Sequence, residues 1–173
     1  MRVIGGELRS RRIKSVPGLA VRPTPDRLRE ALFNVLAPRI AGTIFLDCYA
    51  GSGSVGIEAL SRGAARTIFV ERNRAALEVL RENLKSLGLE EKAVIARTLS
   101  KEHMADIAFI DPPYTLEEEY PSALETIAAT RCELAIAQHM TRFTLAETYG
   151  ALKKKRILRQ GDNCLSFFER SAT

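Results

Sequence analysis

The sequence is poor in residues that hold metals or form disulfides. It contains three cysteines, Cys48, Cys132 and Cys164, which are widely spaced and form no C-x-x-C pair. Only His103 and His139 could complete a metal site with them. An odd number of scattered cysteines is typical of reduced thiols in a cytosolic protein. We therefore expect no metal centre and no disulfide framework.

Long apolar runs are also absent. No stretch approaches the roughly 18 apolar residues that cross a bilayer, and no apolar signal segment follows the charges at the N-terminus. With 173 residues, 46% of them hydrophobic, the chain is long enough for one complete core and short for two. These features predict a cytoplasmic protein with one domain and a small appendage, outside any membrane.

Excess positive charge is confined to one end of the chain. The net charge is +5, yet residues 1–29 hold eight Arg and Lys against Glu7 and Asp26, so residues 30–173 carry −1. Residues 2–16, RVIGGELRSRRIKSV, alternate apolar and basic positions, which predicts a β-hairpin or two short strands projecting ahead of the core. We expect residues 1–21 to form this basic extension and residues 22–173 the main domain.

The segment RPTPDRLREALFN, residues 22–34, reads as the start of a helix. Thr24 or Asp26 is placed to cap it, and the two prolines stiffen its entry. Arginines near a helix start are not favoured by its dipole, so their clustering indicates an anionic partner. Plain surface ion pairing, or a solvated charged strand for residues 2–16, is the alternative. The candidate contacts to a nucleic-acid backbone are Arg9, Arg11, Arg12, Lys14, Arg22, Arg27 and Arg29.

Residues 43–63, TIFLDCYAGSGSVGIEALSRG, predict a strand, a glycine turn and a helix in one run. The glycines at 51, 53 and 56 have the G-x-G-x-x-G spacing, which brings backbone close to a ligand and directs a helix N-terminus at it. Glu71 follows the next strand, TIFVE, where an acid accepts hydrogen bonds from ribose hydroxyls. This fingerprint alone leaves NAD(P) and S-adenosylmethionine open.

The tetrapeptide Asp111-Pro112-Pro113-Tyr114 decides between the two cofactors. It follows the apolar run 107–110, so it ends a strand beside the crevice where doubly wound sheets bind ligands. A carboxylate and a proline-restrained carbonyl can accept both N–H bonds of an exocyclic amine, while the tyrosine ring stacks on its base. Hydride transfer requires no such group. The pattern favours amine methylation, and a plain strand-ending turn is the alternative.

The remaining periodicity predicts an α/β domain with a parallel sheet. Helices are expected over 75–87 and 121–129, and strands over 67–71, 93–96, 107–110 and 133–138. Two alternating runs around Gly161-Asp162-Asn163 predict a closing antiparallel hairpin. Its lysines add to a nucleic-acid face or protect a solvated edge strand.

Taken together, MRVIGG, RPTPDRLREALFN, LDCYAGSGSVGIEALSRGA, Glu71 and DPPY resemble the bacterial RsmD-type methyltransferases over essentially the whole chain. The resemblance implies a Rossmann-like class I S-adenosylmethionine-dependent methyltransferase fold. In that fold a mostly parallel seven-stranded sheet has helices on both faces, an antiparallel C-terminal hairpin and a small N-terminal β-hairpin extension. It also implies methyl transfer to the exocyclic N2 of one guanine in 16S ribosomal RNA, at the guanine-966-type site.

The expected roles follow from the residue chemistry and the resemblance together. Asp111, Pro112 and Tyr114 are the catalytic candidates, and S-adenosylmethionine is converted to S-adenosylhomocysteine without a metal. The partner is 16S rRNA, free or in an assembling 30S particle, and the protein is expected to be a monomer. Adenine-N6 methylation of DNA or RNA is the second hypothesis, ahead of a silent RNA-binding protein and a dehydrogenase. The candidate cofactor contacts are Asp47, Tyr49, Gly51, Gly53, Gly56, Glu71 and Arg72.

Overall fold

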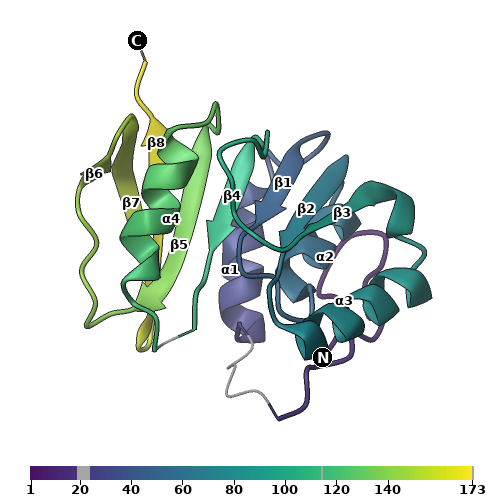
Figure 1. Cartoon of the computed structure of the whole chain (residues 1–173). Helices are drawn as coiled ribbons and strands as arrows, with labels where there is room; N and C mark the ends of the chain where they lie inside the picture. The colour runs from purple at the N-terminus through teal and green to yellow at the C-terminus, as the bar shows by residue number, and fades with distance from the viewer. Residues whose placement is uncertain (19–23, 114, 173) are drawn as a thin grey trace.

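The computed structural model describes residues 1–18, 24–113 and 115–172. One eight-stranded sheet crosses the molecule in the order β3-β2-β1-β4-β5-β8-β7-β6 (Figure 1). The expected class I methyltransferase architecture is confirmed, but the sheet has eight strands instead of seven. The additional strand is β6 (Thr148–Tyr149), whose two residues are too few to produce an alternating pattern in the sequence.

Five parallel strands make the first half of the sheet, and three antiparallel strands close it. Four of the parallel strands, β1, β2, β4 and β5, are largely buried, because helices cover both faces of this half, whereas the edge strand β3 is partly exposed. The C-terminal hairpin forms as the turn at residues 161–163 predicts. The strands are β1 (Ile44–Asp47), β2 (Arg66–Val70), β3 (Ala93–Ala96), β4 (Ile107–Ile110), β5 (Leu134–Met140), β7 (Leu152–Gln160) and β8 (Asn163–Arg170).

Helices cover the sheet unequally. Buried side chains of α1 (Asp26–Leu36), α2 (Ser54–Ser61) and α3 (Arg74–Ser86) share one core, and those of α4 (Glu119–Ala128) pack in a second core on the other face. A short 3-10 turn, Glu90–Lys92, leads into β3. None of the helices in the described ranges is long and apolar enough to cross a membrane.

The N-terminal segment, residues 1–16, is part of the core instead of a projecting hairpin. Its two arms meet at a single antiparallel bridge between Arg2 and Arg12. Val3 and Ile13 are 2% and 3% exposed and belong to the same core as α1, α2 and α3. The expectation of a hairpin standing ahead of the domain is therefore wrong, since the apolar positions between the arginines point inward.

Two buried polar side chains fasten this segment to the domain. Glu58 of α2 accepts hydrogen bonds from the backbone N–H groups of Ile4 (2.8 Å) and Gly5 (2.9 Å). Asn83 of α3 accepts from Lys14 N–H (2.8 Å), and its amide donates to the carbonyls of Lys14 and Ser52. Asn83 thus ties the N-terminal segment to the glycine loop.

Helix α1 starts differently from the prediction. Pro25 occupies the N-cap position and no side chain caps the helix, so neither Thr24 nor Asp26 has the expected capping role. The residue before a proline is kept out of helical conformation, which leaves Thr24 outside the helix. Asp26 is instead the first residue of α1, where its charge suits the helix dipole.

Arg29 is a buried structural residue, which corrects its assignment as an RNA contact. Its side chain is fully buried and donates to the carbonyl of Arg2 (2.7 Å) and to Asp26 Oδ1 (3.1 Å). Its Nε lies 3.9 Å from Glu58 Oε1, and Arg62 Nε donates to the other Glu58 oxygen at 2.9 Å. Because the guanidinium faces the interior, it cannot contact a phosphate. It holds the N-terminal segment against α1 and α2.

We expect Glu58→Ala to lower the free energy of unfolding by about 3–5 kcal/mol, because the change removes the negative charge beside the buried Arg29 and leaves two backbone N–H groups without their acceptor. Glu78→Ala is the matched control. Glu78 lies on the exposed face of α3 with its oxygen 3.8 Å from Arg74, an ion pair worth less than about 1 kcal/mol. Urea denaturation of both variants is the measurement, and equal losses would contradict the proposed anchor.

Candidate active site

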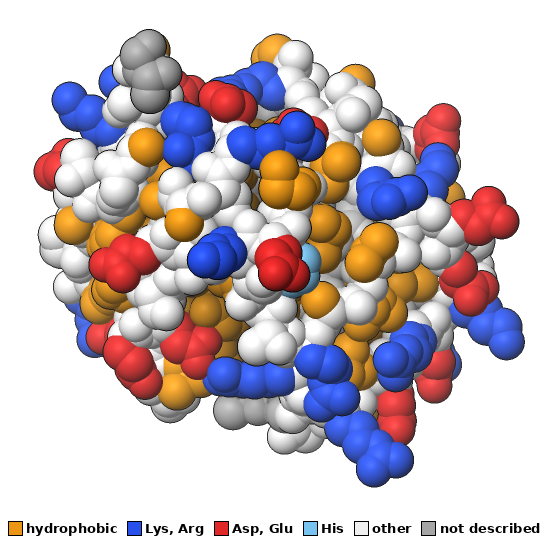
Figure 2. Space-filling view, turned by 45° about the horizontal axis from the view of Figure 1, so that its top comes forward, with side chains coloured by type: hydrophobic (Ala, Val, Ile, Leu, Met, Phe, Trp, Pro, Cys, Tyr) orange, Lys and Arg blue, Asp and Glu red, His pale blue; other side chains and the backbone are white. Residues whose placement is uncertain are grey.

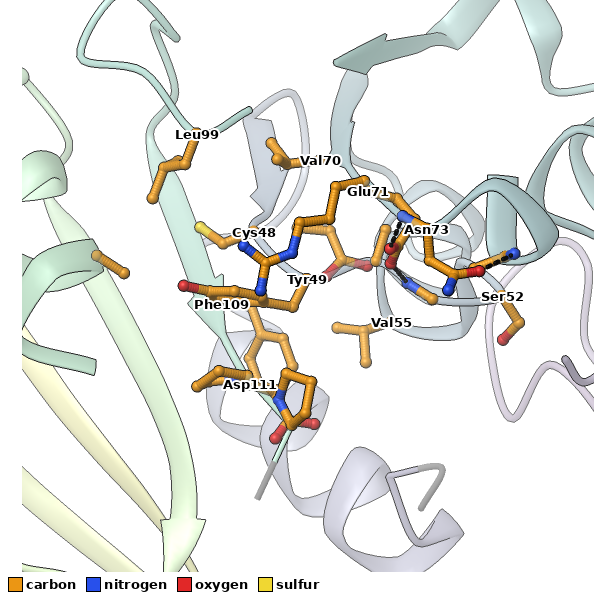
Figure 3. A pocket seen from close by; sticks show the side chains of 18 of the residues that line it. Cys48, Tyr49, Ser52, Val55, Val70, Glu71, Asn73, Leu99, Phe109 and Asp111 are labelled. Atoms are coloured by element: carbon orange, nitrogen blue, oxygen red, sulfur yellow. Dashed lines mark hydrogen bonds between the residues drawn. The ribbon is translucent and has the colours of Figure 1, made fainter. Parts of the chain in front are cut away.

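A cavity of about 570 Å³ opens at the carboxyl ends of β1, β2 and β4. Strand β1 pairs with β2 on one side and β4 on the other, so the chain reverses its direction of progress across the sheet at this point. Open α/β sheets bind ligands at such a switch point. Figure 3 shows Glu71 and Asn73 at one end of the cavity and Asp111 at the other, with Tyr49 and Val55 between them.

The glycine loop forms one wall of the cavity. Gly51 has a φ of +56°, and a Cβ atom built there would meet nothing within 4 Å. Its N–H donates to Glu71 Oε2 at 2.7 Å. Gly51 therefore supplies both the left-handed turn and an open stretch of backbone beside the cavity, as expected for a cofactor contact.

Gly53 and Gly56 have a different role from the one expected. Neither lines the cavity. A Cβ atom at Gly53 would lie 2.4 Å from Leu80 Cδ1, and one at Gly56 would lie 2.3 Å from Phe69 Cε1. These two glycines permit close packing of α2 against β2 and α3. They hold the glycine loop in place beside the cavity but do not line the cavity themselves.

Glu71 organises the loop from the end of β2. One carboxylate oxygen accepts from Gly51 N–H, and the other accepts from Asn73 N–H at 2.9 Å. Each carboxylate oxygen can accept a further hydrogen bond, and the side chain borders the cavity. The position fits the predicted contact to ribose hydroxyls, with the added function of holding the loop.

Asp47 is a buried acid at the end of β1. It is 1% exposed, and its Oδ2 accepts from Gly56 N–H at 3.0 Å, so it satisfies a free N–H group in the first turn of α2. Burial and the charge of Glu71 raise the pKa of Asp47 to about 7, against the lowering effect of the Gly56 hydrogen bond. The helix N-terminus is thus occupied by the protein's own carboxylate.

Tyr49 and Arg72 meet at the rim of the cavity through Glu119. Arg72 Nη2 donates to Glu119 Oε1 at 2.7 Å, and Tyr49 also hydrogen-bonds to Glu119. Burial, followed by the interaction with Glu119, raises the pKa of Tyr49, so its hydroxyl stays a donor. Arg97 Nη2 donates to the carbonyl of Arg72 at 2.9 Å. Both predicted residues line the cavity, and Glu119 holds them there.

Asp111 and Pro112 line the far end of the cavity, next to β4. The Asp111 carboxylate is half-buried and accepts a hydrogen bond from the Thr24 hydroxyl. Loss of hydration, followed by repulsion from Asp47, raises the pKa of Asp111 to about 8. Pro112 is buried, which restrains the backbone carbonyl beside the acid. Tyr114, the third predicted catalytic residue, lies outside the described residues.

Several residues that shape the site were missed by the sequence reasoning. Thr24 stands in the RPT segment, but helix-capping rules assigned it to α1. Glu119 begins α4, and no motif distinguishes it from the acids around it. Ser15 and Val16 line the cavity because the N-terminal segment packs beside the glycine loop. Only the contacts between distant parts of the chain identify these residues.

The basic candidates of the N-terminal segment lie on the surface. Lys14 Nζ pairs with Glu82 at 2.9 Å, and Arg11 Nη2 donates to the Ser86 carbonyl at 3.1 Å. Arg9, Arg12 and Arg27 are exposed. Arg22 lies outside the described residues. Figure 2 shows Lys and Arg side chains interspersed with Asp and Glu over one face of the molecule. They are most closely grouped towards the lower right of this view.

Metal-ligating side chains do not cluster within the described part of the chain. No group of three or more His, Cys, Asp or Glu there is arranged to hold a metal ion. Cys48, Cys132 and Cys164 are free and buried.

The chain is similar to known proteins over most of its length. A family model described as "Conserved hypothetical protein 95" matches residues 1–169. Ribosomal RNA small subunit methyltransferase D of Escherichia coli K12 is 42% identical over 136 residues, which cover 72% of this chain and 67% of that protein. A solved structure of a hypothetical protein from Thermus thermophilus has a TM-score of 0.81 at 31% identity and covers 98% of this chain and 99% of the other.

A more distant structure shares the fold alone. An RNA methyltransferase of Salinibacter ruber, solved with S-adenosyl-L-homocysteine, has a TM-score of 0.65 at 14% identity and covers 88% of this chain and 96% of its own. The fold is that of the class I methyltransferases. Within that class, the chain belongs to the RsmD-type family, as the match over residues 1–169 and the Escherichia coli relative show.

We expect Asp47→Asn to raise the free energy of unfolding at pH 8 by about 2–4 kcal/mol relative to wild type. The folded-state pKa of Asp47 lies above its unfolded value of 3.8. The folded protein therefore holds a proton that the unfolded chain releases, so wild-type stability falls as the pH rises from about 4 to 7. Asparagine carries no charge and keeps an acceptor for Gly56 N–H.

The measurement is urea denaturation at pH 5 and pH 8. Asp162→Asn, in the exposed turn between β7 and β8, is the matched control and should change little at either pH. A stability difference between Asp47→Asn and wild type that does not grow with pH would contradict the raised pKa.

Proposed function

We propose that this protein transfers a methyl group from S-adenosylmethionine to the exocyclic N2 of a guanine in 16S ribosomal RNA. The observation that carries the proposal is the placement of Asp111 and Pro112 in the same cavity as the glycine loop and Glu71. One end of the cavity suits a nucleoside, and the other offers two acceptors to an amine. The name of the Escherichia coli relative supports small-subunit rRNA as the substrate.

The electrostatics of the cavity favour a cationic cofactor. Asp47 and Asp111 lie close enough for the charge of one to raise the pKa of the other, so their ionised forms repel each other. S-adenosylmethionine carries a sulfonium and an ammonium group, and either cation would relieve this repulsion. A dinucleotide would place its pyrophosphate at the N-terminus of α2. There the carboxylate of Asp47 already accepts from Gly56 N–H, which argues against a dehydrogenase.

The cofactor supplies a methyl group that is already electrophilic on its sulfonium sulfur. The protein's residues then have to hold the accepting amine and exclude water. Asp111 and the Pro112 carbonyl accept the two N–H bonds of the amine, which turns the nitrogen lone pair away from them. The ionised carboxylate also stabilises positive charge that develops on this nitrogen, and Asp111 or water takes the proton that the methylated amine loses as S-adenosylhomocysteine is released. Glu71 holds the ribose, and Asp47 faces the cationic amine of the cofactor.

The RNA is bound by the surface arginines and lysine of the N-terminal segment and by the start of α1. The candidates within the described residues are Arg9, Arg11, Arg12, Lys14 and Arg27. Arg22 is proposed from the sequence alone. Because a base edge is hidden by pairing or stacking, the target guanine has to be unpaired or turned out into the cavity. Tyr114 is the proposed stacking partner. We further propose that the protein acts as a monomer in the cytoplasm, on free rRNA or an assembling 30S particle.

Nucleoside analysis tests the function directly. The protein is incubated with labelled S-adenosylmethionine and rRNA from cells that lack this activity, and the RNA is digested. N2-methylguanosine is the expected product. Label in N6-methyladenosine would establish the second hypothesis, since the same pair of acceptors also fits an adenine amine. No transfer to either RNA or DNA would overturn the proposal.

We expect Asp111→Ala to cut the single-turnover rate by about 100-fold or more while keeping most of the cofactor affinity, because a preorganised charge is lost from the transition state. Asp111→Asn should retain more activity than Ala, since its amide oxygen still accepts from the amine. If Asp111 only ends a turn, Ala would cost about 1 kcal/mol of stability and leave the rate per folded molecule unchanged. Melting temperature and rate, measured on the same preparations, separate these outcomes.

A further inference from the structure

Thr24 connects the segment before α1 to the acid at the end of β4. Its side chain is 7% exposed and borders the same cavity as Asp111. Its hydroxyl hydrogen-bonds to the Asp111 carboxylate. The bond lowers the pKa of Asp111 and so favours the ionised carboxylate, to which the hydroxyl donates. The contact joins residues that lie far apart in the sequence, and no rule for helix starts predicts it.

The position of Thr24 is fixed from its C-terminal side. Pro25, with φ −54° and ψ 141°, is the N-cap of α1, and its carbonyl accepts from Leu28 N–H and Arg29 N–H. Leu28 is 1% exposed and Arg29 is fully buried, so the first turn of the helix is anchored in the core. A threonine before a proline also has few backbone conformations. The hydroxyl is therefore presented to Asp111 by a rigid support.

The surroundings of Asp111 show why such a donor matters. Among the described charged residues, Asp47 of β1 is the one whose charge acts on Asp111, and it repels the ionised form. Loss of hydration acts in the same direction. The Thr24 hydroxyl is the group in this part of the chain that favours the ionised carboxylate. A neutral carboxyl would present an O–H group where the amine needs an acceptor.

We propose that Thr24 is a positioning residue for methyl transfer: its hydroxyl donates to the Asp111 carboxylate and holds it in one orientation, which leaves the remaining acceptor sites for the amine of the base. This inference rests on the proposed function of Asp111. The RPT segment, residues 22–24, would then contribute to the reaction through Thr24 as well as to RNA binding through its arginine. Any movement of the start of α1 would reach the acid through this hydroxyl.

The test compares Thr24→Val, which keeps the shape and removes the hydroxyl, with Thr24→Ser, which keeps the hydroxyl. We expect Val to lower the single-turnover rate about 10- to 100-fold at saturating RNA and cofactor, the factor that matches loss of a hydrogen bond to a charged group. Ser should stay within about threefold of wild type. Cofactor affinity should be unchanged in both, because Thr24 contacts the acid that faces the base.

Thr43→Val is the matched control. The Thr43 hydroxyl also makes a hydrogen bond, to the Ile40 carbonyl at 2.7 Å, but it lies before β1 at the opposite end of the sheet. Its loss should change the melting temperature without changing the rate per folded molecule. Equal rate losses in Thr24→Val and Thr24→Ser, or a wild-type rate in Thr24→Val, would overturn the positioning role.

A readout without catalysis separates this inference from the proposed function. The titration of the Asp111 side chain is followed by carbon NMR in the protein alone, with Asp111→Asn used to assign its signal. Thr24→Val should move the Asp111 midpoint to higher pH and Thr24→Ser should not, because only Val removes the donor to the ionised form. An unmoved midpoint overturns the inference even if the enzyme methylates guanine. A wild-type rate in Asp111→Ala overturns the proposed function even if the midpoint moves.

Discussion

The active site depends on two carboxylates placed at the carboxyl ends of neighbouring strands. Asp47 ends β1 and holds the first turn of α2 through Gly56 N–H, and Asp111 follows β4. Parallel pairing of β1 with β4 fixes their separation. Asp47 is buried and Asp111 is half-buried, and the charge of Asp47 raises the pKa of Asp111. We therefore expect the site to gain stability when a cation enters it.

The sequence predicted the sheet and several residues that line the cavity at its edge, because both depend on local patterns. Alternation and apolar runs located the central strands within about one residue, and the fingerprint located Gly51, Glu71 and Asp47. The fingerprint also predicted cofactor contacts at Gly53 and Gly56, but both glycines pack against neighbouring side chains, since the same glycine spacing permits close packing as well as ligand binding. Strand β6 escaped prediction because two residues carry no period.

The remaining errors concern contacts between distant residues. Arg29 looks like a surface cation by its place in a basic helix, and only its bond to the Arg2 carbonyl and its closeness to Glu58 show that it is buried. The sequence predicts a separate basic N-terminal segment. In the structure Glu58 and Asn83 accept hydrogen bonds from its backbone N–H groups and attach it to the domain. These anchors make the segment part of the cavity wall, where Ser15 and Val16 lie beside the glycine loop.

The most direct test of this electrostatic account is the proton balance of cofactor binding. Calorimetry at pH 7 in buffers of different ionisation enthalpy measures the protons released when S-adenosylmethionine binds. If its cationic groups stabilise ionised Asp47 and Asp111, the observed heat will depend on the buffer and show net proton release. S-adenosylhomocysteine, whose sulfur is neutral, will release fewer protons. Identical heats in every buffer for both ligands would contradict the account.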